Sequence, residues 1–416
     1  MANACGVDFG TSNSTVGWVR PGPAVLLPLE DGKPTLPSVV FFNADEDQVR
    51  YGRAALADYL EGYDGRLMRS LKSLLGTSLM EGQTEVAGRS LPFKQLLGHF
   101  IGEVKRRAEQ QAGREFSSVV LGRPVYFVDD DPVADRLAED TLAEIARSVG
   151  FREIGFQYEP IAAAFDYESR IEREELVLIA DIGGGTSDFS LVRLGPQRAA
   201  RVERRDDLLA NGGVHIGGTD FDKYLSLSSV MPLLGYGSTM LSGAAIPSSY
   251  YFNLATWHTI NQAYTRKSIG QLAELVRDAA EPAKLNRLRR LIDERAGHWL
   301  AMRVEEAKIA LSDAPEVQLA LDRLDPPAVV DIRREDFAAA IEGMVDQVGA
   351  TVRRLLAEAG VAPDQVDTVF FTGGSSGVAS LRERIAAIVP DARRVEGDLF
   401  GSIGAGLALD AARKFG

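Results

Sequence analysis

The chain has 416 residues, of which 45% are hydrophobic and 25% charged, as is ordinary for a globular protein. A net charge of −13 argues against a general nucleic-acid binder or a binder of anionic membranes, although a local anion site made of backbone amides is still allowed. The single cysteine, Cys5, excludes an internal disulfide framework. No run of about 18 apolar residues and no secretory signal is visible, so we expect a soluble cytoplasmic protein.

The first part of the chain combines short strands with longer helices. Apolar and alternating patterns predict strands at residues 6–9, 15–20, 24–29, 38–42 and 118–124. Helical periodicity predicts helices at residues 54–59, 94–111 and 132–149. Pro160 suits the first turn of a further helix that carries the sequence I-A-A-A-F.

The second part repeats this plan. Strands are predicted at residues 176–181, 188–193 and 199–206, followed much later by residues 366–371. Helices are predicted at residues 271–280, 283–311 and 336–359. The last strand leads into a glycine turn at residues 372–377.

One pattern occurs twice in the chain. It reads G-V-D-F-G-T-S-N-S-T-V-G-W-V from Gly6 and I-A-D-I-G-G-G-T-S-D-F-S-L-V from Ile179. Each copy is an apolar strand, an aspartate, a glycine-rich turn with hydroxyl residues and a return strand. Glycines let backbone amides close on an anion, and an aspartate beside a phosphate is best explained by a hydrated divalent cation. The repeat therefore predicts two similar α/β lobes around a nucleotide.

Two other segments have unusual composition. Residues 225–265 contain no Asp, Glu, Lys or Arg but many aromatic residues. An insertion folded against its own subdomain is the favoured interpretation, with an exposed partner surface as the alternative. The basic run at residues 284–295 alternates with leucines at helical spacing, which favours a solvated helix face over a docking site.

These motifs together resemble the ATPase domain of the seventy-kilodalton heat-shock chaperones, within the actin–hexokinase superfamily, over essentially all 416 residues. Within the family the chain most resembles the short YegD-like members. The resemblance implies a duplicated actin-like (ribonuclease-H-like) α/β ATPase fold with two lobes around a nucleotide cleft. Lobe I would comprise residues 1–170 and 397–416, with an inserted subdomain at about 33–116. Lobe II would comprise residues 171–396, with an inserted subdomain at about 222–312.

The resemblance also implies roles for individual residues. Lys72 is expected to polarise the attacking water, and Glu159 to join the hydration shell of Mg²⁺. Pro124 is expected to be part of the relay from the nucleotide to partner surfaces. Asp8, Asp181 and Glu159 are the expected metal site, and Lys72, Glu159, Asp181 and Thr186 the expected catalytic residues. Phosphate binding is expected from Gly10, Thr11, Ser12, Asn13, Gly183, Gly184, Gly185, Thr186, Gly217 and Gly218.

The adenosine side of the resemblance lies in the second half of the chain. Gly373, Gly374 and Ser375 resemble the turn beneath the ribose and phosphates. Glu305 and Lys308 fit ribose hydrogen bonding, and Ser312 fits the adenine edge. The sequence departs from the family at Ile309, where an arginine usually stacks on the purine, and at Thr219, where a glutamate is usual. Residues 397–409 resemble the small-residue helix that returns to the first lobe.

The resemblance implies an ATP- and Mg²⁺-binding, slowly ATP-hydrolysing, chaperone-like protein that closes its lobes around the nucleotide. Protein clients or co-chaperones would be its partners, and neither nucleic acid nor membrane is expected. The chain stops at Gly416, so a peptide-binding domain is expected to be absent. Three alternatives stay open: a small-molecule kinase of the same superfamily, an actin-like filament protein, and a non-hydrolysing nucleotide sensor or scaffold that binds a client through residues 225–265.

Overall fold

The computed structural model describes residues 3–19, 24–86, 89–128, 131–199, 201, 204–397 and 401–416. The chain forms two compact units, each of which is described by itself. Unit 1 comprises Met1–His215, Val348–Ser376 and Arg382–Gly416, and unit 2 comprises Ile216–Gln347 and Gly377–Leu381. The predicted boundaries of the two lobes divide the chain differently and stay a prediction.

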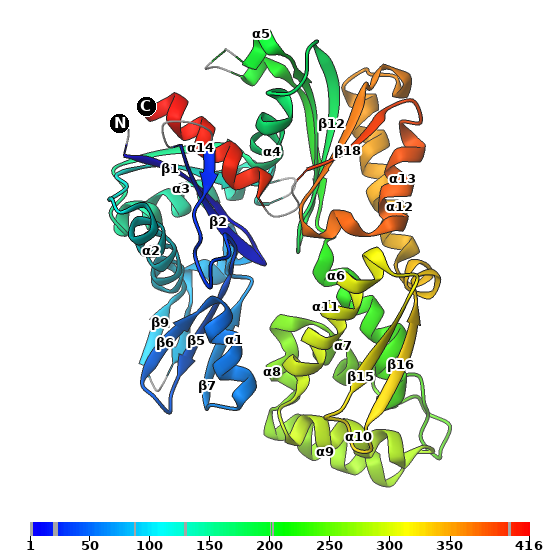
Figure 1. Cartoon of the computed structure of the whole chain (residues 1–416). Helices are drawn as coiled ribbons and strands as arrows, with labels where there is room; N and C mark the ends of the chain where they lie inside the picture. Colours follow the sequence, from blue (N-terminus) through cyan, green and yellow to red (C-terminus); the bar gives the residue numbers. More distant parts are fainter. Residues whose placement is uncertain are drawn as a thin grey trace. The chain divides into compact units, whose positions relative to one another are not determined.

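Unit 1 contains two sheets with the same strand order. One includes β1 and β2, and the other includes β12 and β18 (Figure 1). The N-terminal sheet has the order β3-β2-β1-β10-β11, and the C-terminal sheet has the order β14-β13-β12-β17-β18. In both sheets the central strand (β1 or β12) and the next two strands in the chain form an antiparallel meander. The last two strands of each sheet are parallel to the central strand. This identical topology confirms the predicted duplicated α/β fold.

The strand bounds define the repeat. The N-terminal sheet contains β1 (Ala4–Phe9), β2 (Asn13–Val19), β3 (Ala24–Leu26), β10 (Ser118–Arg123) and β11 (Glu153–Tyr158), with β4 (Leu36–Pro37) paired to β2. The C-terminal sheet contains β12 (Glu175–Ile182), β13 (Ser187–Leu194), β14 (Leu208–Val214), β17 (Thr368–Thr372) and β18 (Arg393–Glu396).

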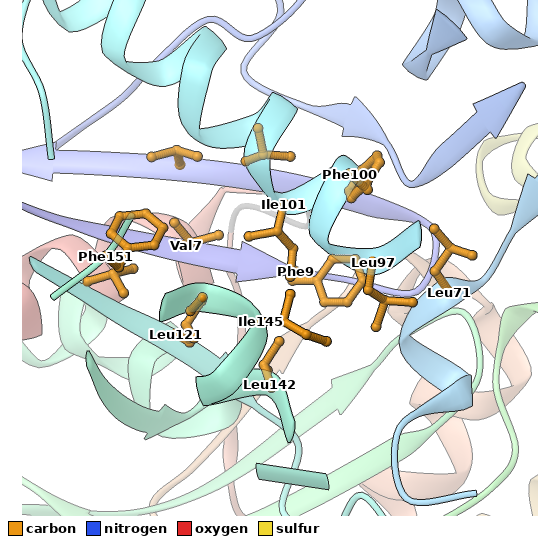
Figure 2. Close-up of a cluster of buried hydrophobic side chains, with 14 of the residues drawn as sticks. Val7, Phe9, Leu71, Leu97, Phe100, Ile101, Leu121, Leu142, Ile145 and Phe151 are labelled. Atoms are coloured by element: carbon orange, nitrogen blue, oxygen red, sulfur yellow. The ribbon is translucent and has the colours of Figure 1, made fainter. Parts of the chain in front are cut away.

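Side-chain alternation along β1 decides which residues enter the core. Figure 2 shows Val7 and Phe9 packed with residues of α2 (Phe93–Ala112) and α3 (Pro132–Ser148) in one hydrophobic cluster. Successive side chains of a strand point to opposite faces, so Gly6 and Asp8 point the other way, toward α14 (Ser402–Phe415). A Cβ atom added to Gly6 would lie 2.3 Å from the backbone of Ala408, so this face and α14 are in close contact.

Helices α4 (Glu159–Glu168) and α14 cross at a glycine (Figure 1). A Cβ atom added to Gly406 would lie 1.8 Å from the carbonyl oxygen of Ala162. The helix α14 packs on the N-terminal sheet, and α4 contacts β12 and β13 of the C-terminal sheet. The predicted close packing of small residues in the last helix is therefore confirmed at Gly406, although the helix begins at Ser402 rather than residue 397. Residues 398–400 of that prediction lie outside the described residues.

Replacing Gly406 with alanine is expected to lower the free energy of unfolding by about 1–3 kcal/mol, the usual cost of overpacking a tight contact. The added methyl group would overlap the Ala162 carbonyl, which belongs to a helix backbone and moves only with its helix. Gly98→Ala in α2 is the matched control, because the nearest atom to its added Cβ is the Ser148 Oγ at 3.8 Å. Alanine there should stabilise the helix by up to about 1 kcal/mol. Denaturant unfolding that shows equal changes for both variants would contradict this account.

The remaining elements of unit 1 are short. A three-stranded sheet is formed by β6 (Gln48–Tyr51), β5 (Val39–Asn43) and β7 (Gly65–Arg69), beside helix α1 (Gly52–Glu61). The strands β8 (Gln83–Val86) and β9 (Arg89–Pro92) form a hairpin, and Leu71–Leu74 forms a single 3₁₀ turn. On the C-terminal sheet, Leu355 of α12 (Arg334–Glu358) approaches Gly212 of β14, and Arg382 of α13 (Ala379–Ile388) lies over the Phe371 ring.

Unit 2 is mostly helical. Its helices are α6 (Gly218–Leu225), α7 (Ser249–Ala255), α8 (Ile260–Ala263), α9 (Arg266–Arg277), α10 (Pro282–Asp293), α11 (Gly297–Asp313) and the first part of α12. A single hairpin of β15 (Glu316–Leu321) and β16 (Ala328–Arg333) follows α11. In α10 the leucines of the basic run are buried, as expected for a helix with one solvated face.

The uncharged segment at residues 225–265 contributes aromatic side chains to the interior of unit 2. Tyr251 is fully buried, and its ring centre is 5.3 Å from that of Tyr236. The Trp257 ring packs edge-on against His298 of α11 at 4.9 Å. The favoured interpretation, an insertion folded against its own subdomain, is therefore supported, although Leu241 is 75% exposed.

Two predicted elements are wrong. The described part of residues 199–206 contains no strand: Pro196–Ala199 is a short helix and Arg205–Asp207 is a 3₁₀ turn. The third strand is β14, which begins at Leu208, nine residues after the predicted start. Residues 200, 202 and 203 lie outside the described residues. Arg204 makes a buried ion pair with Glu168 at 2.6 Å and contacts Asp207, which holds this charged stretch in a turn. The glycines of β14 weaken the sequence signal for a strand.

The second wrong element is the long helix predicted at residues 283–311, which is two helices, α10 and α11. The break occurs at Arg295, which has a left-handed backbone conformation with φ +51°. The following Gly297 is packed so closely that an added Cβ would lie 2.6 Å from the Tyr264 hydroxyl oxygen. Tertiary packing against the uncharged segment therefore ends a pattern that is helical by periodicity.

Candidate functional site

The candidate site lies in unit 1, at the carboxyl ends of β1 and β12. Asp8 pairs with Thr15 across the β1–β2 turn, and Asp181 pairs with Asp188 across the β12–β13 turn. Both turns therefore have the same length and register. Asp181 shares its sheet face with Ile179, which packs in the cluster around α4, so its side chain points toward the side where α4 begins at Glu159.

Four carboxylates surround one ammonium group at this place. Lys72 Nζ donates a hydrogen bond to Glu159 Oε1, and both side chains are buried. The charges of Asp8 and Asp188 also act on Lys72, and those of Glu159, Asp188 and Asp8 act on Asp181. All five side chains are less than 10% exposed. With one cation among four acidic groups, the site carries an excess of negative charge when all the carboxylates are ionised.

The pKa values of these groups reflect burial and mutual repulsion. Burial raises the pKa of Asp8 to about 7, with repulsion from Glu159 adding to the effect and Lys72 opposing it. Burial and then repulsion from Glu159 and Asp188 raise the pKa of Asp181 well above its usual range. Burial alone would lower the pKa of Lys72, but the carboxylates of Glu159, Asp8 and Asp188 outweigh it and raise that pKa. Lys72 is therefore charged at neutral pH.

Lys72 is held in place by its neighbours in the chain. It lies in the 3₁₀ turn Leu71–Leu74, and Leu71 is buried in the hydrophobic cluster that Figure 2 shows. The preceding Ser70 has a left-handed conformation with φ +58°, which is uncommon for a residue other than glycine and is found often at functional sites. The helical segment that contains Lys72 is only this single turn.

The first glycine turn, residues 10–13, is braced from outside. The Ser38 Oγ donates a hydrogen bond to the Gly10 carbonyl at 2.7 Å, and the Ser38 amide donates to the Ser12 carbonyl at 2.9 Å. The turn is so tight that a Cβ atom on Gly10 would lie 2.2 Å from the Asn13 carbonyl oxygen. Sequence reasoning missed Ser38, because nothing in its local pattern links it to a turn 28 residues earlier.

The second glycine turn, residues 183–186, lies directly against the first. A Cβ atom on Gly184 would lie 2.3 Å from the Ser12 Oγ. The turn is closed by a hydrogen bond from the Gly183 amide to the Thr186 carbonyl at 2.9 Å. The Thr186 hydroxyl donates to Asp188 at 2.8 Å, which ties the turn to the acidic cluster. The two predicted phosphate turns are thus brought together.

The third predicted turn, Gly373 to Ser375, lies beside Asp181. Gly373 has φ +81°, and a Cβ atom there would lie 2.5 Å from Asp181 Oδ1, so only glycine fits. The Ser376 hydroxyl donates to the Gly373 carbonyl at 2.8 Å, which stabilises the turn. Ser375 and Ser376 are buried, and Gly374 begins the short 3₁₀ helix that contains both.

The remaining predicted nucleotide-binding residues belong to unit 2: Gly217, Gly218, Glu305, Lys308 and Ser312. Lys308 Nζ donates to Asp222 at 2.9 Å and to the Gly218 carbonyl at 3.2 Å, so two of the predicted residues are in contact. Gly217 precedes Gly218 at the start of α6, and its amide donates to Asp220 at 3.0 Å. The partly buried Glu305 lies one turn before Lys308 on α11.

A small cavity in unit 2 brings Ser312 next to Lys308. Its wall is formed by residues of α11, α12 and the start of α13: Lys308, Leu311, Ser312, Arg334, Phe337, Ala338, Val378, Ala379 and Ser380. Gly377 leaves room at its edge, since a Cβ atom there would lie 3.1 Å from the Ser312 Oγ. Ile309, on the same helix, is 57% exposed. The roles of these residues toward a nucleotide stay predictions.

The acidic cluster fits a hydrated divalent cation. Its buried carboxylates exceed its single ammonium group, and burial holds protons on Asp8 and Asp181 that a cation would replace. Among the residues that the structure describes, no three His, Cys, Asp or Glu side chains form a cage for direct metal ligation. Mg²⁺ usually keeps several water ligands and takes only one or two carboxylates, so the arrangement suits this ion.

The raised pKa of Asp8 predicts a pH-dependent stability in chelator and without nucleotide. In the unfolded chain Asp8 ionises near its usual value of 3.8, whereas in the folded chain its pKa is about 7. Its contribution to the free energy of unfolding is complete below about pH 4 and is lost as the pH rises to about 7. Asp8→Asn carries no such proton, so its melting temperature should exceed that of the wild type by an amount that grows from pH 4 to 7 and then stays constant. A difference independent of pH would show that Asp8 ionises normally.

In the part of the chain that the structure describes, no helix is both long enough and apolar enough to cross a bilayer.

The chain resembles known proteins over almost all of its length. A model of the family described as "Hsp70 protein" matches residues 4–228 and 275–409. The Chaperone protein HscA homolog of Shewanella sp. (strain ANA-3) is 27% identical over 430 residues, which cover 98% of this chain and 58% of the relative. The Chaperone protein HscA of Citrobacter koseri is 28% identical over 429 residues, with the same coverage.

The chain thus spans about 58% of the length of these relatives. Residues 229–274, between the two matched stretches, include most of the uncharged segment. Since the family model matches well over half of the chain, this protein belongs to the Hsp70 family.

Proposed function

We propose that the chain binds ATP with Mg²⁺ and hydrolyses it slowly, as the ATPase part of a chaperone-type protein. The observation that carries the proposal is the buried Lys72–Glu159 pair among the carboxylates of Asp8, Asp181 and Asp188, next to two facing glycine turns. Glycine turns suit phosphates, and the cluster suits a phosphate-bound cation. Membership of the Hsp70 family supports the nucleotide as ATP or ADP.

In this proposal the two turns hold the phosphates. The backbone amides of residues 10–13 and 183–186 bind phosphate oxygens, and the Thr11, Ser12 and Thr186 hydroxyls add donors. Ser38 keeps the first turn in its shape through the Gly10 carbonyl. Because Ser38 braces the first turn and the Gly183–Thr186 hydrogen bond closes the second, little ordering is needed when the nucleotide binds.

Lys72 supplies the positive charge for hydrolysis. Its ammonium group is fixed by Glu159 and stays protonated because the surrounding carboxylates raise its pKa. Beside the terminal phosphate it would orient the attacking water and stabilise the charge that develops during phosphoryl transfer. Phosphoryl transfer depends chiefly on positioning and on charge stabilisation, so a fixed cation is the central requirement.

Asp8, Asp181 and Glu159 would hold Mg²⁺ through water molecules. When bound, the ion neutralises phosphate charge and helps to orient the phosphates. The carboxylates orient the water molecules around the ion, and the burial of the cluster strengthens each of these interactions.

The base side of the proposed site differs from that of the family. In unit 2, Glu305, Lys308 and Ser312 are the residues proposed to bind the nucleoside. The exposed Ile309 offers an apolar contact where a cationic stack is usual. Losing a cation–π contact costs about 1 kcal/mol, so nucleotide affinity would be lower than with an arginine at this position.

The remaining parts of the proposal concern the wider biology. Nucleotide binding would drive closure of the predicted lobes and thereby alter contacts with protein clients or co-chaperones, as the HscA chaperone relatives suggest by their names. We further propose a cytoplasmic location and a YegD-like subtype, which rest on the sequence alone.

The test is a comparison of ligands on the whole chain. Thermal unfolding and calorimetry are measured with ATP and Mg²⁺, with ADP and Mg²⁺, with ATP and EDTA, and without nucleotide. At 100 times the dissociation constant, the two Mg²⁺ complexes should stabilise the fold by about 2.7 kcal/mol, and ATP in EDTA by clearly less. Release of phosphate under single-turnover conditions should be slow but should depend on Mg²⁺. No stabilisation by either nucleotide at millimolar concentration would refute the proposal.

A further inference from the structure

A buried hydroxyl group lies at the end of β17. Thr372 is 1% exposed, and its Oγ1 has no hydrogen bond to any of the residues described. A buried polar group without a partner costs about 1–3 kcal/mol of stability, so such groups are retained mainly where a ligand or a water molecule satisfies them. Neither the family resemblance nor the residue motifs pointed to this threonine.

The direction of the Thr372 side chain follows from the sheet. Thr372 is in register with Asp181 on the parallel neighbour β12, and Asp181 is in register with Asp188 on β13. Partners in register point to the same face. Two residues earlier on this face, Phe370 packs in the cluster around α4. The hydroxyl of Thr372 therefore lies in one row with the two carboxylates, on the side where Glu159 begins α4.

The duplicated sheets show why the position is special. In the N-terminal sheet the strand that corresponds to β17 is β10, and the residue beside Asp8 on it is Gly122. A Cβ atom on Gly122 would lie 3.2 Å from Glu159 Oε1, so this carboxylate occupies the space that a side chain there would take. On the β10 side Asp8 therefore has the Glu159 carboxylate beside it, and on the β17 side Asp181 has the Thr372 hydroxyl.

The groups in this row, the Thr372 hydroxyl and the carboxylates of Asp181 and Asp188, indicate which ligand the hydroxyl binds. A water molecule bound to a divalent cation directs both of its hydrogen atoms outward, and a hydroxyl oxygen with no other partner is a free acceptor for one of them. Carboxylates on Asp181 and Asp188 attract the cation to this row. A hydrogen bond donated by the Thr372 hydroxyl to a phosphate oxygen would instead place the phosphate against the carboxylates of Asp181 and Asp188, which repel it.

We propose that Thr372 is a positioning residue of the cation site, and that its hydroxyl oxygen accepts a hydrogen bond from a water molecule of the hydrated divalent cation beside Asp181. The inference rests on the proposed function, because it uses the Mg²⁺ site of that proposal. It assigns to the C-terminal half of the site the kind of contact that Glu159 would make in the N-terminal half.

The test compares Thr372→Val with Thr372→Ser on the whole chain. Valine has nearly the same shape but no hydroxyl, whereas serine keeps the hydroxyl. Thr84→Val is the matched control, because Thr84 is also a buried threonine whose hydroxyl has no partner among the described residues, and it lies in the β8–β9 hairpin away from the acidic cluster. Binding of Mn²⁺, followed by electron paramagnetic resonance, and of Mg²⁺, followed by competition, is measured with ADP bound. ADP binding in EDTA is measured separately.

Thr372→Val should weaken binding of the divalent cation about fivefold, the effect of one hydrogen bond of about 1 kcal/mol. Thr372→Ser and Thr84→Val should bind it within about twofold of the wild type, and ADP affinity in EDTA should be unchanged in all variants. In EDTA, Thr372→Val should melt about 1–3 °C higher than the wild type, since a costly buried hydroxyl has been removed.

The outcomes separate this inference from the proposed function. If the wild type binds ADP and Mn²⁺ normally but Thr372→Val binds Mn²⁺ equally well, the role of Thr372 is refuted and the proposed function stands. If the wild type binds neither nucleotide nor cation, both are refuted. If Thr372→Val fails to fold, the serine variant carries the test together with Thr372→Cys, which has similar bulk and only a weak acceptor. If the Thr372→Cys variant binds Mn²⁺ as tightly as the Thr372→Ser variant, the inference is refuted.

Discussion

Lys72→Ala is expected to slow ATP hydrolysis by ~10³-fold or more, the lower range for removing a cation that stabilises phosphoryl transfer, while nucleotide binding stays measurable. The reason is geometric and electrostatic. Lys72 is the ammonium group that faces the acidic cluster, and Glu159 fixes its position in a buried place where no water substitutes for its charge. Single-turnover hydrolysis and equilibrium ADP binding are the two measurements.

Stability must be separated from catalysis in this experiment. Removing one partner of a buried ion pair leaves a buried charge alone and costs about 3–5 kcal/mol, so both proteins are assayed well below the melting temperature of the variant. Lys105→Ala is the control, because Lys105 also forms an ion pair with a glutamate, Glu109, at 2.5 Å, but far along α2 from the site. The control should hydrolyse ATP at the wild-type rate. An unchanged single-turnover rate in Lys72→Ala would refute the proposed catalytic role of this lysine.

Asp8→Asn is expected to weaken ATP binding about 10–100-fold in the presence of Mg²⁺, the usual cost of losing an outer-shell partner of a metal. In EDTA the effect should vanish or reverse. Without the cation, a carboxylate near the phosphates only repels them, and asparagine removes that repulsion while keeping the shape. The ratio of affinities with and without Mg²⁺ is therefore the decisive quantity, and calorimetry measures it directly.

The same variant contains its own control, since ATP binding in EDTA reports on the folded phosphate turns. Equal affinity with and without Mg²⁺ in the wild type would contradict a cation site at Asp8. A loss of affinity in both conditions would instead indicate that the turn at residues 10–13 has been disturbed. The pH series on stability gives an independent measure, because it needs no ligand.

Several features of the site could be predicted from sequence because they depend on local chemistry. The spacing from Asp8 to Thr15 equals that from Asp181 to Asp188, and the register of both strand pairs confirms that the two turns are equivalent. The glycines at positions 10, 184 and 373 also predict that other atoms approach the backbone closely. In the structure, a Cβ atom added to any of them would lie within 2.5 Å of a backbone or side-chain atom.

Other features depend on residues that are distant in the chain. Ser38 braces the first turn, yet its partner lies 28 residues away. The helical pattern at residues 283–311 is interrupted only because Gly297 packs against Tyr264. Likewise, the strand predicted at residues 199–206 is replaced by a turn whose arginine, Arg204, reaches back to Glu168. Local periodicity cannot report such contacts, since it records the preference of a segment and not the partner that overrides it.

The sequence by itself determined the duplicated α/β fold and the chemical type of the site, because both follow from period-two strands, glycine turns and the aspartates at their ends. Only the tertiary structure decided how the charges act on one another. Lys72 and Glu159 are 87 residues apart in the chain, and their pairing requires the packing of Leu71 in one core and of α4 on another sheet. Burial of Asp8 and Asp181, together with repulsion from Glu159, raises the pKa values of both aspartates, and Lys72 opposes this effect. Burial at the end of β17 also leaves the Thr372 hydroxyl without a partner among the described residues, because desolvation depends on what surrounds a group in space.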